Sequence, residues 1–466
     1  MQSKKTLAVI GGGPGGYVAA IRAAQLGAEV HIVEKERFGG TCLNVGCIPT
    51  KVLIHTAESY RSLPQEAKHG LIVENPRIDW PTLMKHKQAI VDRLVQGVAG
   101  LLKANNVTIH TGNAILKKGR VIDVDGKETI RPDAIILATG SLPVTLPFPG
   151  HDLDGVIDST DALSMDKLPG SMVIMGGGVI GTEFAYLYNA LGVKVTVIEM
   201  LSQILPPVDG EISALLRKEL EAQGITFLTG AKVLSAAKKE TELEISVESG
   251  GKQSLVCDKL LVAVGRKPNT AGIGLEEAGI RLERGAVVAD EHFRTNVDGI
   301  YAIGDCNAKI MLAHAASAQG ISAVEHALGH GGGYRGNSVP SCVYTFPEVA
   351  GVGMTEEQTK AAGIEYKVGR VPLAAIGKAL IEGGENGVAK VIADTKHGEI
   401  LGVHMLGSRA TDLIAEAAMA IGSELTVEEI ASTIHPHPTM SEALMEAAHD
   451  ALDGAIHWPP KRHVRL

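Results

Sequence analysis

The chain of 466 residues carries 44 Lys+Arg against 53 Asp+Glu, a formal net charge of −9. This balance argues against a surface for nucleic acid or for an anionic membrane. Hydrophobic residues make up 45 % and charged residues 21 % of the chain, as in a globular protein of about three domains. Glycine is the exception, because 55 residues are about 12 % against a usual share of about 7 %. The glycines cluster without a three-residue period, which excludes collagen and predicts tight backbone turns.

The amino terminus is short and polar, and residues 7–10 already form an apolar run. No apolar stretch is long enough to span a bilayer, and no small-residue cleavage site follows the basic start. We therefore expect the mature chain to begin here and to stay in the cytoplasm. Five cysteines in so long a chain do not form a secreted disulfide framework. Cys42 and Cys47, five residues apart, instead suggest redox chemistry in a reducing compartment.

A repeat with a constant offset is the clearest signal along the chain. The first copy runs from the apolar residues 7–10 through a glycine-rich turn and an alanine-rich helix to a second apolar run that ends in Glu34. Each feature returns 165 residues later, from Gly11 at Gly176 to Glu34 at Glu199. Both copies predict a strand, a GxGxxG turn, a helix and a second strand that ends in an acid.

Each part of this repeat has a physical role in binding a dinucleotide. The first glycine permits a tight turn, the second lets the backbone approach a pyrophosphate, and the third lets the helix pack closely on the strand. The acid accepts hydrogen bonds from a ribose hydroxyl. The glycines are Gly11, Gly13 and Gly16 in the first copy and Gly176, Gly178 and Gly181 in the second. One glycine loop often serves only to turn the chain, but two copies in matched βαβ context predict two dinucleotide sites.

Glu199 also bears on which nicotinamide the second copy binds. A carboxylate at this position repels a 2′-phosphate, and residues 200–203 supply no arginine that could receive one. The sequence therefore favours NAD over NADP.

The segment that holds the cysteine pair cannot be one regular helix if the two thiols form a disulfide. Residues i and i+5 of a helix have Cα atoms about 8.6 Å apart, whereas a disulfide needs about 4.4–6.8 Å. If Cys42 and Cys47 pair, the backbone between them departs from the helix, and Gly46 and Pro49 are candidate positions. Two unrelated buried thiols are the alternative.

The sequence GGTCLNVGCIPTK at 39–51 resembles the redox-active segment of the pyridine nucleotide–disulfide oxidoreductases. The resemblance covers the whole chain and is greatest to the members that oxidise dihydrolipoamide with NAD⁺. Further matching motifs are ATG at 138–140, VGRKPN at 264–269, YAIGD at 301–305, MLAH at 311–314, FPEV at 346–349 and HPHPT at 435–439. The resemblance implies a flavoprotein that passes electrons between a dithiol and NAD by way of FAD and a Cys42–Cys47 disulfide.

The resemblance places FAD on the first repeat and NAD on the second, in agreement with a cysteine pair directly after the first repeat. Asp305 is expected near the ribityl–phosphate part of FAD, although it could also act as a turn or cap residue. The implied FAD residues are Gly11, Gly13, Pro14, Gly16, Glu34, Thr41, Lys51, Gly112, Ala114, Thr139, Gly140, Asp305, Met311, Leu312 and Ala313. The implied NAD residues are Gly176, Gly178, Ile180, Gly181, Glu183, Glu199 and Gly265.

The resemblance also implies roles for the groups around the cysteines. Cys47 is the thiol next to the flavin and Cys42 exchanges with the substrate sulfur. Lys51, one helical turn after Cys47, is expected beside the flavin, and a solvated surface lysine is its alternative. Glu183 is expected to pair with this lysine, and an ordinary first-turn acid that complements the helix dipole is its alternative.

A base for dithiol oxidation is absent near the cysteines, but the sequence HPHP near the carboxyl end offers two histidines. His435 and His437 share a face in extended chain, so spacing does not choose between them. The resemblance selects His437 as the base and Glu442 as the carboxylate that orients it, with a structural role for His435. In the family this pair comes from the partner subunit, so the resemblance implies a homodimer.

The expected fold class is α/β, with two Rossmann-like dinucleotide-binding domains and a C-terminal α+β dimerisation domain. We expect an FAD-binding domain at 1–145, an NAD-binding domain at 146–270, a central segment that completes the FAD site at 271–338 and the dimerisation domain at 339–466. Strand-like runs at 388–393 and 401–406 and an amphipathic helix at 410–421 belong to the last of these. The glycine- and proline-rich points near 143–150 and 329–340 mark boundaries.

Two other functions are compatible with parts of the pattern. A reductase of a glutathione-like disulfide would more often show basic residues after the second repeat, and they are missing. Mercuric reductases and high-molecular-weight thioredoxin reductases add a second redox pair near the carboxyl end, whereas the last cysteine here is Cys342. A redox sensor without turnover is less favoured, since every expected reactive residue is intact. The remaining cysteines lack the spacing of metal ligands, so no metal is expected. There is no lipoyl domain, so a lipoyl arm would arrive on a separate protein.

Overall fold

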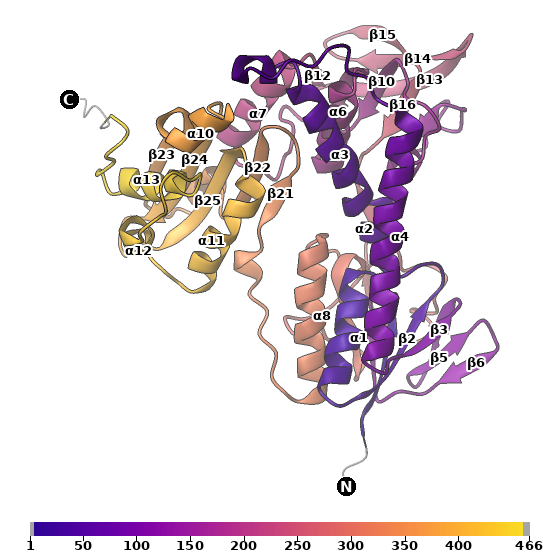
Figure 1. The fold of residues 1–466 in the computed structure, drawn as a ribbon. Helices are drawn as coiled ribbons and strands as arrows, with labels where there is room; N and C mark the ends of the chain where they lie inside the picture. Colours follow the sequence, from indigo (N-terminus) through magenta and orange to yellow (C-terminus); the bar gives the residue numbers. More distant parts are fainter. Residues whose placement is uncertain (1–3, 460–466) are drawn as a thin grey trace.

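In the computed structural model, which describes residues 4–459, the chain forms three bodies, each built around one five-stranded sheet (Figure 1). In this view the first sheet lies at the bottom, the second at the top, and the third, coloured orange to yellow, at the left. Residues 1–3 of the expected start and residues 460–466 of the tail lie outside the described range. Within residues 4–459 no helix is long and apolar enough to cross a membrane.

The first sheet is parallel throughout, with the order β20-β7-β1-β2-β3, and contains the first copy of the repeat. Helix α1 connects β1 to β2, and α8 lies beside α1 (Figure 1). Strand β20 returns from far along the chain and pairs with β7. The bounds are β1 Thr6–Ile10, α1 Pro14–Gln25, β2 Glu29–Glu34, β3 Thr108–Thr111, β7 Ala134–Leu137, β20 Ile300–Ala302 and α8 Ala313–Leu328.

The second sheet repeats this arrangement with the order β12-β11-β10-β16-β9, again parallel, and contains the second copy. The strand, turn, helix and strand predicted for each copy are therefore confirmed. The bounds are β9 Val156–Ile157, α5 Ser159–Ala162, β10 Ser171–Met175, α6 Val179–Ala190, β11 Lys194–Glu199, α7 Gly210–Ala222, β12 Thr226–Thr229 and β16 Lys259–Val262.

The two copies agree in backbone detail as well as in element order. The φ angle is +105° at Gly11 and +110° at Gly176, in a region that L side chains rarely adopt. A Cβ added at either position would meet a backbone carbonyl oxygen at 2.3 or 2.4 Å. Only glycine fits the first position of each turn, which is the physical reason for the repeated motif.

The third sheet is antiparallel, with the order β21-β22-β25-β24-β23, and α11 and α13 pack on it. The strands predicted at 388–393 and 401–406 and the helix at 410–421 are confirmed as β24, β25 and α11. The bounds are β21 Ser341–Val343, β22 Glu348–Gly353, α9 Glu356–Ala361, β23 Tyr366–Pro372, α10 Gly377–Glu382, β24 Val388–Asp394, β25 Ile400–Gly407, α11 Ala410–Gly422, α12 Val427–Ser432 and α13 Glu442–Ala451. The expected α/β class is confirmed, while the exact domain boundaries stay a prediction.

Helix α4, Trp80–Ala104, runs between the first body and the second (Figure 1). Its residues Trp80 and Leu83 belong to the core of the second sheet, whereas Val98 and Leu102 belong to the core of the first. The remaining elements complete these bodies. They are α2 Gly40–Val45, α3 Cys47–Ser62, β4 Ala114–Lys117, β5 Val121–Val124, β6 Glu128–Ile130, β8 Ser141–Pro143, β13 Lys232–Lys239, β14 Glu242–Glu248, β15 Lys252–Cys257, β17 Arg266–Pro268, β18 Leu282–Glu283, β19 Ala286–Val287 and four 3₁₀ turns at Glu66–His69, Gly304–Asn307, Gly336–Ser338 and Leu373–Ala375.

A buried ion cluster joins the second and third bodies. Lys390 on β24 is 1 % exposed, and its Nζ lies 2.9 Å from Asp209 Oδ1, 3.0 Å from Glu211 Oε2 and 2.7 Å from Glu356 Oε2. Asp209 is fully buried and caps the start of α7. Removing one partner of such a buried pair typically costs about 3–5 kcal/mol. The cluster therefore fixes α7 against the third sheet.

Candidate active site

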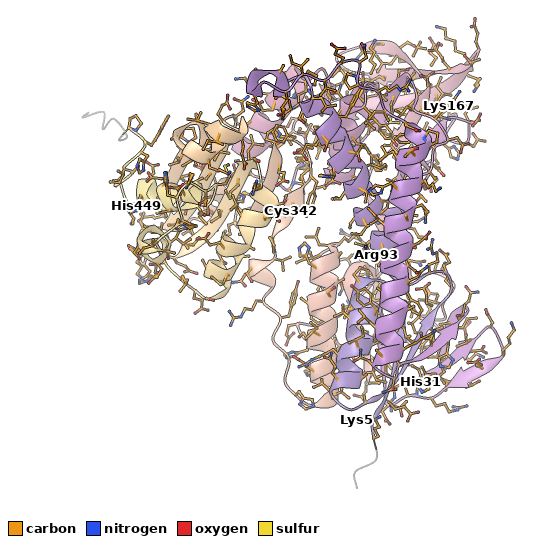
Figure 2. All side chains as sticks on the ribbon, viewed as in Figure 1. Lys5, His31, Arg93, Lys167, Cys342 and His449 are labelled. Atoms are coloured by element: carbon orange, nitrogen blue, oxygen red, sulfur yellow. The ribbon has the colours of Figure 1, made fainter. Side chains whose placement is uncertain are left out.

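A cavity of about 2460 Å³ lies where the three bodies meet. It is more than twice the usual upper size of a small-molecule pocket, which is about 1,000 Å³. The glycine turns of both repeats line it, together with the cysteine segment and residues 340–344 of the third body. In the view of Figure 2, Cys342 lies at the inner edge of the third body, toward the other two sheets. One continuous space thus adjoins both predicted dinucleotide sites and the thiols.

The helices that follow the two glycine turns begin without a side-chain cap. Gly13 and Gly178 are the N-caps of α1 and α6, and no side chain in the described part of the chain caps either helix start. Unpaired N–H groups and the helix dipole make such a terminus a favourable place for a phosphate. A Cβ added at Gly16 or Gly181 would lie 1.9 Å from a carbonyl oxygen of the preceding turn. Gly16 and Gly181 therefore let each helix pack closely on its turn, and the uncapped helix starts offer N–H donors for a pyrophosphate.

The acids at the ends of β2 and β11 are oriented by the backbone. Glu34 accepts hydrogen bonds from the N–H of Gly12 at 2.7 Å and of Glu36 at 2.9 Å. Glu199 accepts the equivalent bonds from Gly177 at 2.6 Å and from Leu201 at 2.8 Å. Both carboxylates line the cavity beside their glycine turn. Their expected bonds to a ribose hydroxyl stay a prediction.

The two redox cysteines lie on consecutive helices rather than on one. Helix α2 ends before Gly46 and α3 begins at Cys47. The backbone angles of Gly46, φ −144° and ψ −117°, interrupt the helix, and a Cβ there would meet the Thr41 carbonyl oxygen at 2.8 Å. The break that a pairing of the cysteines requires falls at Gly46 and not at Pro49. Pro49 lies in the first turn of α3, where the missing N–H is tolerated.

The two thiols contact each other, and their surroundings make Cys47 the more acidic. The hydrogen bond with Cys42 and the charge of Lys51 lower the pKa of Cys47 to about 7, although partial desolvation of this thiol, which is exposed to the cavity, opposes both. The same hydrogen bond, together with burial, raises the pKa of Cys42. Cys47 is also the first residue of α3, where the helix dipole favours an anion. The pair therefore favours a thiolate at Cys47 and a thiol at Cys42.

Lys51 and Glu183 form an ion pair on the cavity wall. The Nζ of Lys51 lies 2.9 and 2.7 Å from the two carboxylate oxygens of Glu183, which is 4 % exposed. The backbone N–H of Tyr344 donates to Glu183 Oε1 at 3.0 Å, and the ring of Tyr344 lies 4.4 Å from Lys51 Nζ. The fold thus brings α3, α6 and the third body together beside the thiols.

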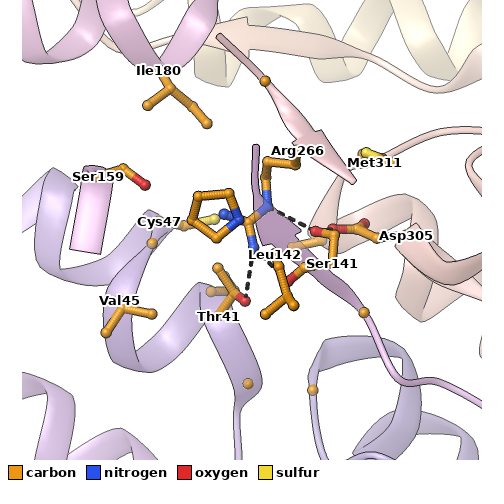
Figure 3. A pocket seen from close by; sticks show the side chains of 18 of the residues that line it. Thr41, Val45, Cys47, Ser141, Leu142, Ser159, Ile180, Arg266, Asp305 and Met311 are labelled. Carbon is orange, nitrogen blue, oxygen red and sulfur yellow. Dashed lines mark hydrogen bonds between the residues drawn. The ribbon is translucent and has the colours of Figure 1, made fainter. Parts of the chain in front are cut away.

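Arg266 on β17 is a functional candidate to which the sequence assigned no role. Its Nε donates to the Ser141 hydroxyl at 2.7 Å, and Nη2 donates to the Thr41 hydroxyl at 3.2 Å (Figure 3). The Ser141 hydroxyl in turn donates to Asp305 at 2.5 Å. Burial lowers the pKa of the Arg266 guanidinium, and the charge of Asp305 opposes this. A charged residue shortly after a buried apolar strand is the signal that could have identified it, since Arg266 comes four residues after the end of β16.

Most of the residues expected to bind a cofactor lie on the cavity wall. In the FAD set these are Gly11, Gly13, Pro14, Glu34, Thr41, Lys51, Gly112, Ala114, Thr139, Gly140, Asp305, Met311, Leu312 and Ala313. In the NAD set they are Gly176, Gly178, Ile180, Glu183, Glu199 and Gly265. Gly16 and Gly181 instead pack the helices onto the turns. Cys42 and Cys47 lie on the wall of the same cavity.

The expected base does not lie on this cavity. His437 Nδ1 is 2.9 Å from Glu442 Oε1, and the His437 side chain is 76 % exposed on the third body. His435 differs, because its side chain is 4 % exposed and its Nε2 lies 2.9 Å from Glu416 Oε1. Within residues 4–459 of one chain, the structure therefore brings together His437 and Glu442 but keeps them apart from the cysteines.

Comparison with known proteins places this arrangement in a family. Residues 5–320 match the family described as pyridine nucleotide-disulphide oxidoreductase, and residues 339–448 match its dimerisation domain. The chain belongs to the pyridine nucleotide-disulphide oxidoreductases. The expected family is thereby confirmed, and the third body contains a dimerisation domain.

Members of this family are similar to the chain over nearly its whole length. Dihydrolipoyl dehydrogenase from Thermus scotoductus is 46 % identical over 459 residues, which cover 97 % of this chain and 98 % of the relative. The enzyme of that name from Bacillus subtilis is 43 % identical, and the alignment covers 98 % of this chain and 100 % of the relative. Among solved structures, LpdA from Mycobacterium tuberculosis has a TM-score of 0.89 at 27 % identity. The match covers 96 % of this chain and 99 % of LpdA. The HOCl-induced flavoprotein disulfide reductase RclA from Escherichia coli has a TM-score of 0.85 at 32 % identity. The match covers 94 % of this chain and 98 % of RclA.

Pyridine nucleotide-disulphide oxidoreductases use FAD and NAD, and the residues present fit both groups. An added Cβ would meet no atom closer than 3.8 Å at Gly13 and none within 4 Å at Gly178, so the second glycine of each turn leaves open space. The uncapped helix starts offer N–H donors to a pyrophosphate. Arg266 adds a partly buried cation to the wall of the same cavity. No group of three or more His, Cys, Asp and Glu in the described part of the chain could hold a metal ion.

Proposed function

We propose that this chain oxidises protein-bound dihydrolipoamide to lipoamide and reduces NAD⁺ to NADH. The observation that carries the proposal is the Cys42–Cys47 pair beside the Lys51–Glu183 ion pair, on a cavity that both glycine turns share. The names of the two bacterial relatives support dihydrolipoamide as the substrate.

The thiol chemistry follows from the unequal pKa values of the two cysteines. A substrate thiolate attacks Cys42 Sγ of the oxidised pair, the disulfide bond breaks, and Cys47 leaves as a thiolate that Lys51 stabilises. The second substrate thiol then displaces Cys42, so the substrate closes its own disulfide and Cys42 takes up a proton. FAD, when bound, supplies the two-electron connection between this dithiol and NAD⁺.

Deprotonation of the substrate needs a base, and we assign it to His437. Glu442 lies within hydrogen-bond distance of Nδ1, which leaves Nε2 free to accept a proton. Because this side chain is exposed and apart from the cavity of its own chain, the proposal places it at the thiols of the partner subunit in a homodimer. His435 is assigned a structural role, with Glu416 as its partner.

The remaining assignments also belong to this proposal. The FAD and NAD residues are those on the cavity wall, with Gly16 and Gly181 as packing positions. The lipoyl arm comes on a separate protein. The four domain ranges and a cytoplasmic location remain as the sequence predicts them.

Reduction of a glutathione-like disulfide with NADPH is the alternative substrate class. Glu199 argues against it, because its carboxylate is held at the second glycine turn where a 2′-phosphate would lie. A redox sensor without turnover is disfavoured by the intact set of reactive groups around Cys47.

A turnover assay of the FAD-loaded protein tests the proposal. We expect NAD⁺ reduction with free dihydrolipoamide and little reduction of glutathione disulfide with NADPH. A Cys47→Ser variant serves as the matched control and is expected to be inactive in both assays. Efficient NADPH-dependent reduction of glutathione disulfide, without activity on dihydrolipoamide, would exclude the proposed substrate.

A further inference from the structure

Tyr344 of the dimerisation domain makes two different contacts with the Lys51–Glu183 pair. Its ring centroid lies 4.4 Å from Lys51 Nζ, and its backbone N–H donates to Glu183 Oε1 at 3.0 Å. Tyr344 directly follows β21, so it reaches the pair from a different body than α3 or α6. Burial raises the pKa of Tyr344 to about 12, so the ring is a neutral phenol at the pH of the reaction.

We propose that Tyr344 is a positioning residue that holds the Lys51 ammonium where it stabilises the Cys47 thiolate. The dimerisation domain would then control the acidity of the redox thiol in its own subunit, besides carrying the proposed base for the partner. This inference rests on the proposed roles of Lys51 and Cys47 but not on the identity of the substrate.

The geometry around Lys51 gives the physical reason. Two carboxylate oxygens of Glu183 lie 2.9 and 2.7 Å from the ammonium, and the Tyr344 ring centroid lies 4.4 Å from it. An aromatic face attracts a cation through its quadrupole, and more strongly where water is partly excluded. The Lys51 side chain is still 28 % exposed, so without the ring it could turn toward water in the cavity. The Lys51 charge would then stabilise the Cys47 thiolate less, because a charge interaction weakens with distance and with exposure to water.

Other groups near Cys47 also raise or lower its pKa, and the test has to separate their influence from that of the Tyr344 ring. Cys42 on α2 lowers the pKa of Cys47 through its hydrogen bond, and Glu183 on α6 raises it through its charge. Arg266 on β17 also interacts electrostatically with Cys47. Lys51 on α3 lowers the pKa and is the group that the Tyr344 ring contacts. An effect of the ring on Cys47 should therefore depend on the presence of Lys51.

A pH titration of the holoenzyme tests this dependence. The FAD-loaded protein is reduced with one equivalent of NADH, and the long-wavelength charge-transfer absorbance is followed against pH. Tyr344→Leu removes the aromatic face, and we expect the titration midpoint to rise by about 0.5–1 pH unit. Tyr344→Phe keeps the face and should titrate like the wild type. In a Lys51→Met background, Tyr344→Leu should cause no further shift.

Two outcomes would overturn the inference while the band is present. One is a midpoint of Tyr344→Leu equal to that of Tyr344→Phe, and the other is an equal shift with and without the Lys51 side chain. If Tyr344→Leu does not yield folded protein with bound FAD, Tyr344→Met gives the same comparison with a flexible side chain of similar length. Absence of the band from the wild type would overturn the Cys47 assignment and this inference together. A normal band without turnover of dihydrolipoamide would count only against the proposed substrate.

Discussion

Cys42 and Cys47 carry the same side chain five residues apart, yet their surroundings move the two pKa values in opposite directions. The difference arises because one thiol donates to the other and because Lys51 lies one turn beyond Cys47 on the same helix. A shift of one pKa unit corresponds to about 1.4 kcal/mol between the protonation states. At the scale of single residues, these contacts decide which sulfur is a thiolate and which is a thiol.

The acidity of Cys47 leads to a spectroscopic prediction for the reduced holoenzyme. The pKa of Cys47 is lowered to about 7, so the thiolate forms above that pH and is protonated as the pH falls below it. The long-wavelength charge-transfer absorbance should therefore be present at pH 8 and decline as the pH falls through about 7. Cys47→Ser should lack the band at every pH, while Cys42→Ser should keep it. A full band in Cys47→Ser would contradict the assignment of the flavin-facing sulfur.

At the scale of elements, both glycine turns meet the same steric requirement, because each helix packs against a carbonyl oxygen of the turn before it. The third glycine of each GxGxxG motif, Gly16 or Gly181, lies in the helix that follows the turn. A Cβ at either position would clash with a carbonyl oxygen of the turn, so only glycine fits there. The cysteine segment solves a different problem, because Gly46 ends α2 so that α3 can begin at Cys47. Glycine thus allows the helix starts with free N–H groups in the two turns, and it allows α3 to start at the Cys47 thiol in the cysteine segment.

The matched turns predict separable losses of the two cofactors. Gly16→Ala should yield protein that has lost FAD, since its Cβ would lie 1.9 Å from a carbonyl oxygen of the first turn. Gly181→Ala meets the same clash in the second turn, and should keep FAD while NAD⁺ binds at least about tenfold more weakly. Gly97→Ala in α4, where a Cβ meets nothing within 4 Å, is the control and should retain both. Bound flavin absorbance and NAD⁺ titration measure the two effects, and loss of FAD from Gly181→Ala would show that the turns are not independent.

At the scale of the whole molecule, the candidate active site lies where the three bodies meet. The glycine turns come from the first two sheets, and the segment 340–344 comes from the third. Helix α4 and the ion cluster of Lys390 hold the second body in place. The exposed His437–Glu442 pair lies apart from this cavity, which fits a site completed by a second subunit.

Mixed dimers test this arrangement. The Cys47→Ser and His437→Ala homodimers should both be impaired, the second by about 10²–10⁴-fold in dithiol oxidation. In a dimer with one subunit of each kind, one of the two sites combines intact cysteines with an intact base. Unfolding and refolding of an equal mixture should therefore restore about a quarter of the wild-type activity if the subunits pair at random. Activity no higher than that of the separate variants would mean that the base acts within its own subunit.

The sequence by itself determined the parts of this protein that depend on local spacing. The two βαβ units, the acids Glu34 and Glu199 and the nearness of Lys51 to Cys47 all follow from helix and strand periodicity within about 30 residues. The resemblance then identified the family and named the candidate site. The glycine at which the helix breaks stayed open, because Gly46 and Pro49 are both compatible with a break in sequence terms.

Only the tertiary structure decided which distant residues meet. Arg266 reaches Thr41 across 225 positions, and Tyr344 reaches Glu183 across 161. No periodicity encodes such contacts, because they depend on how the sheets and helices pack and not on spacing along the chain. For the same reason the sequence could name His437 and Cys47 but could not show that one chain keeps them apart.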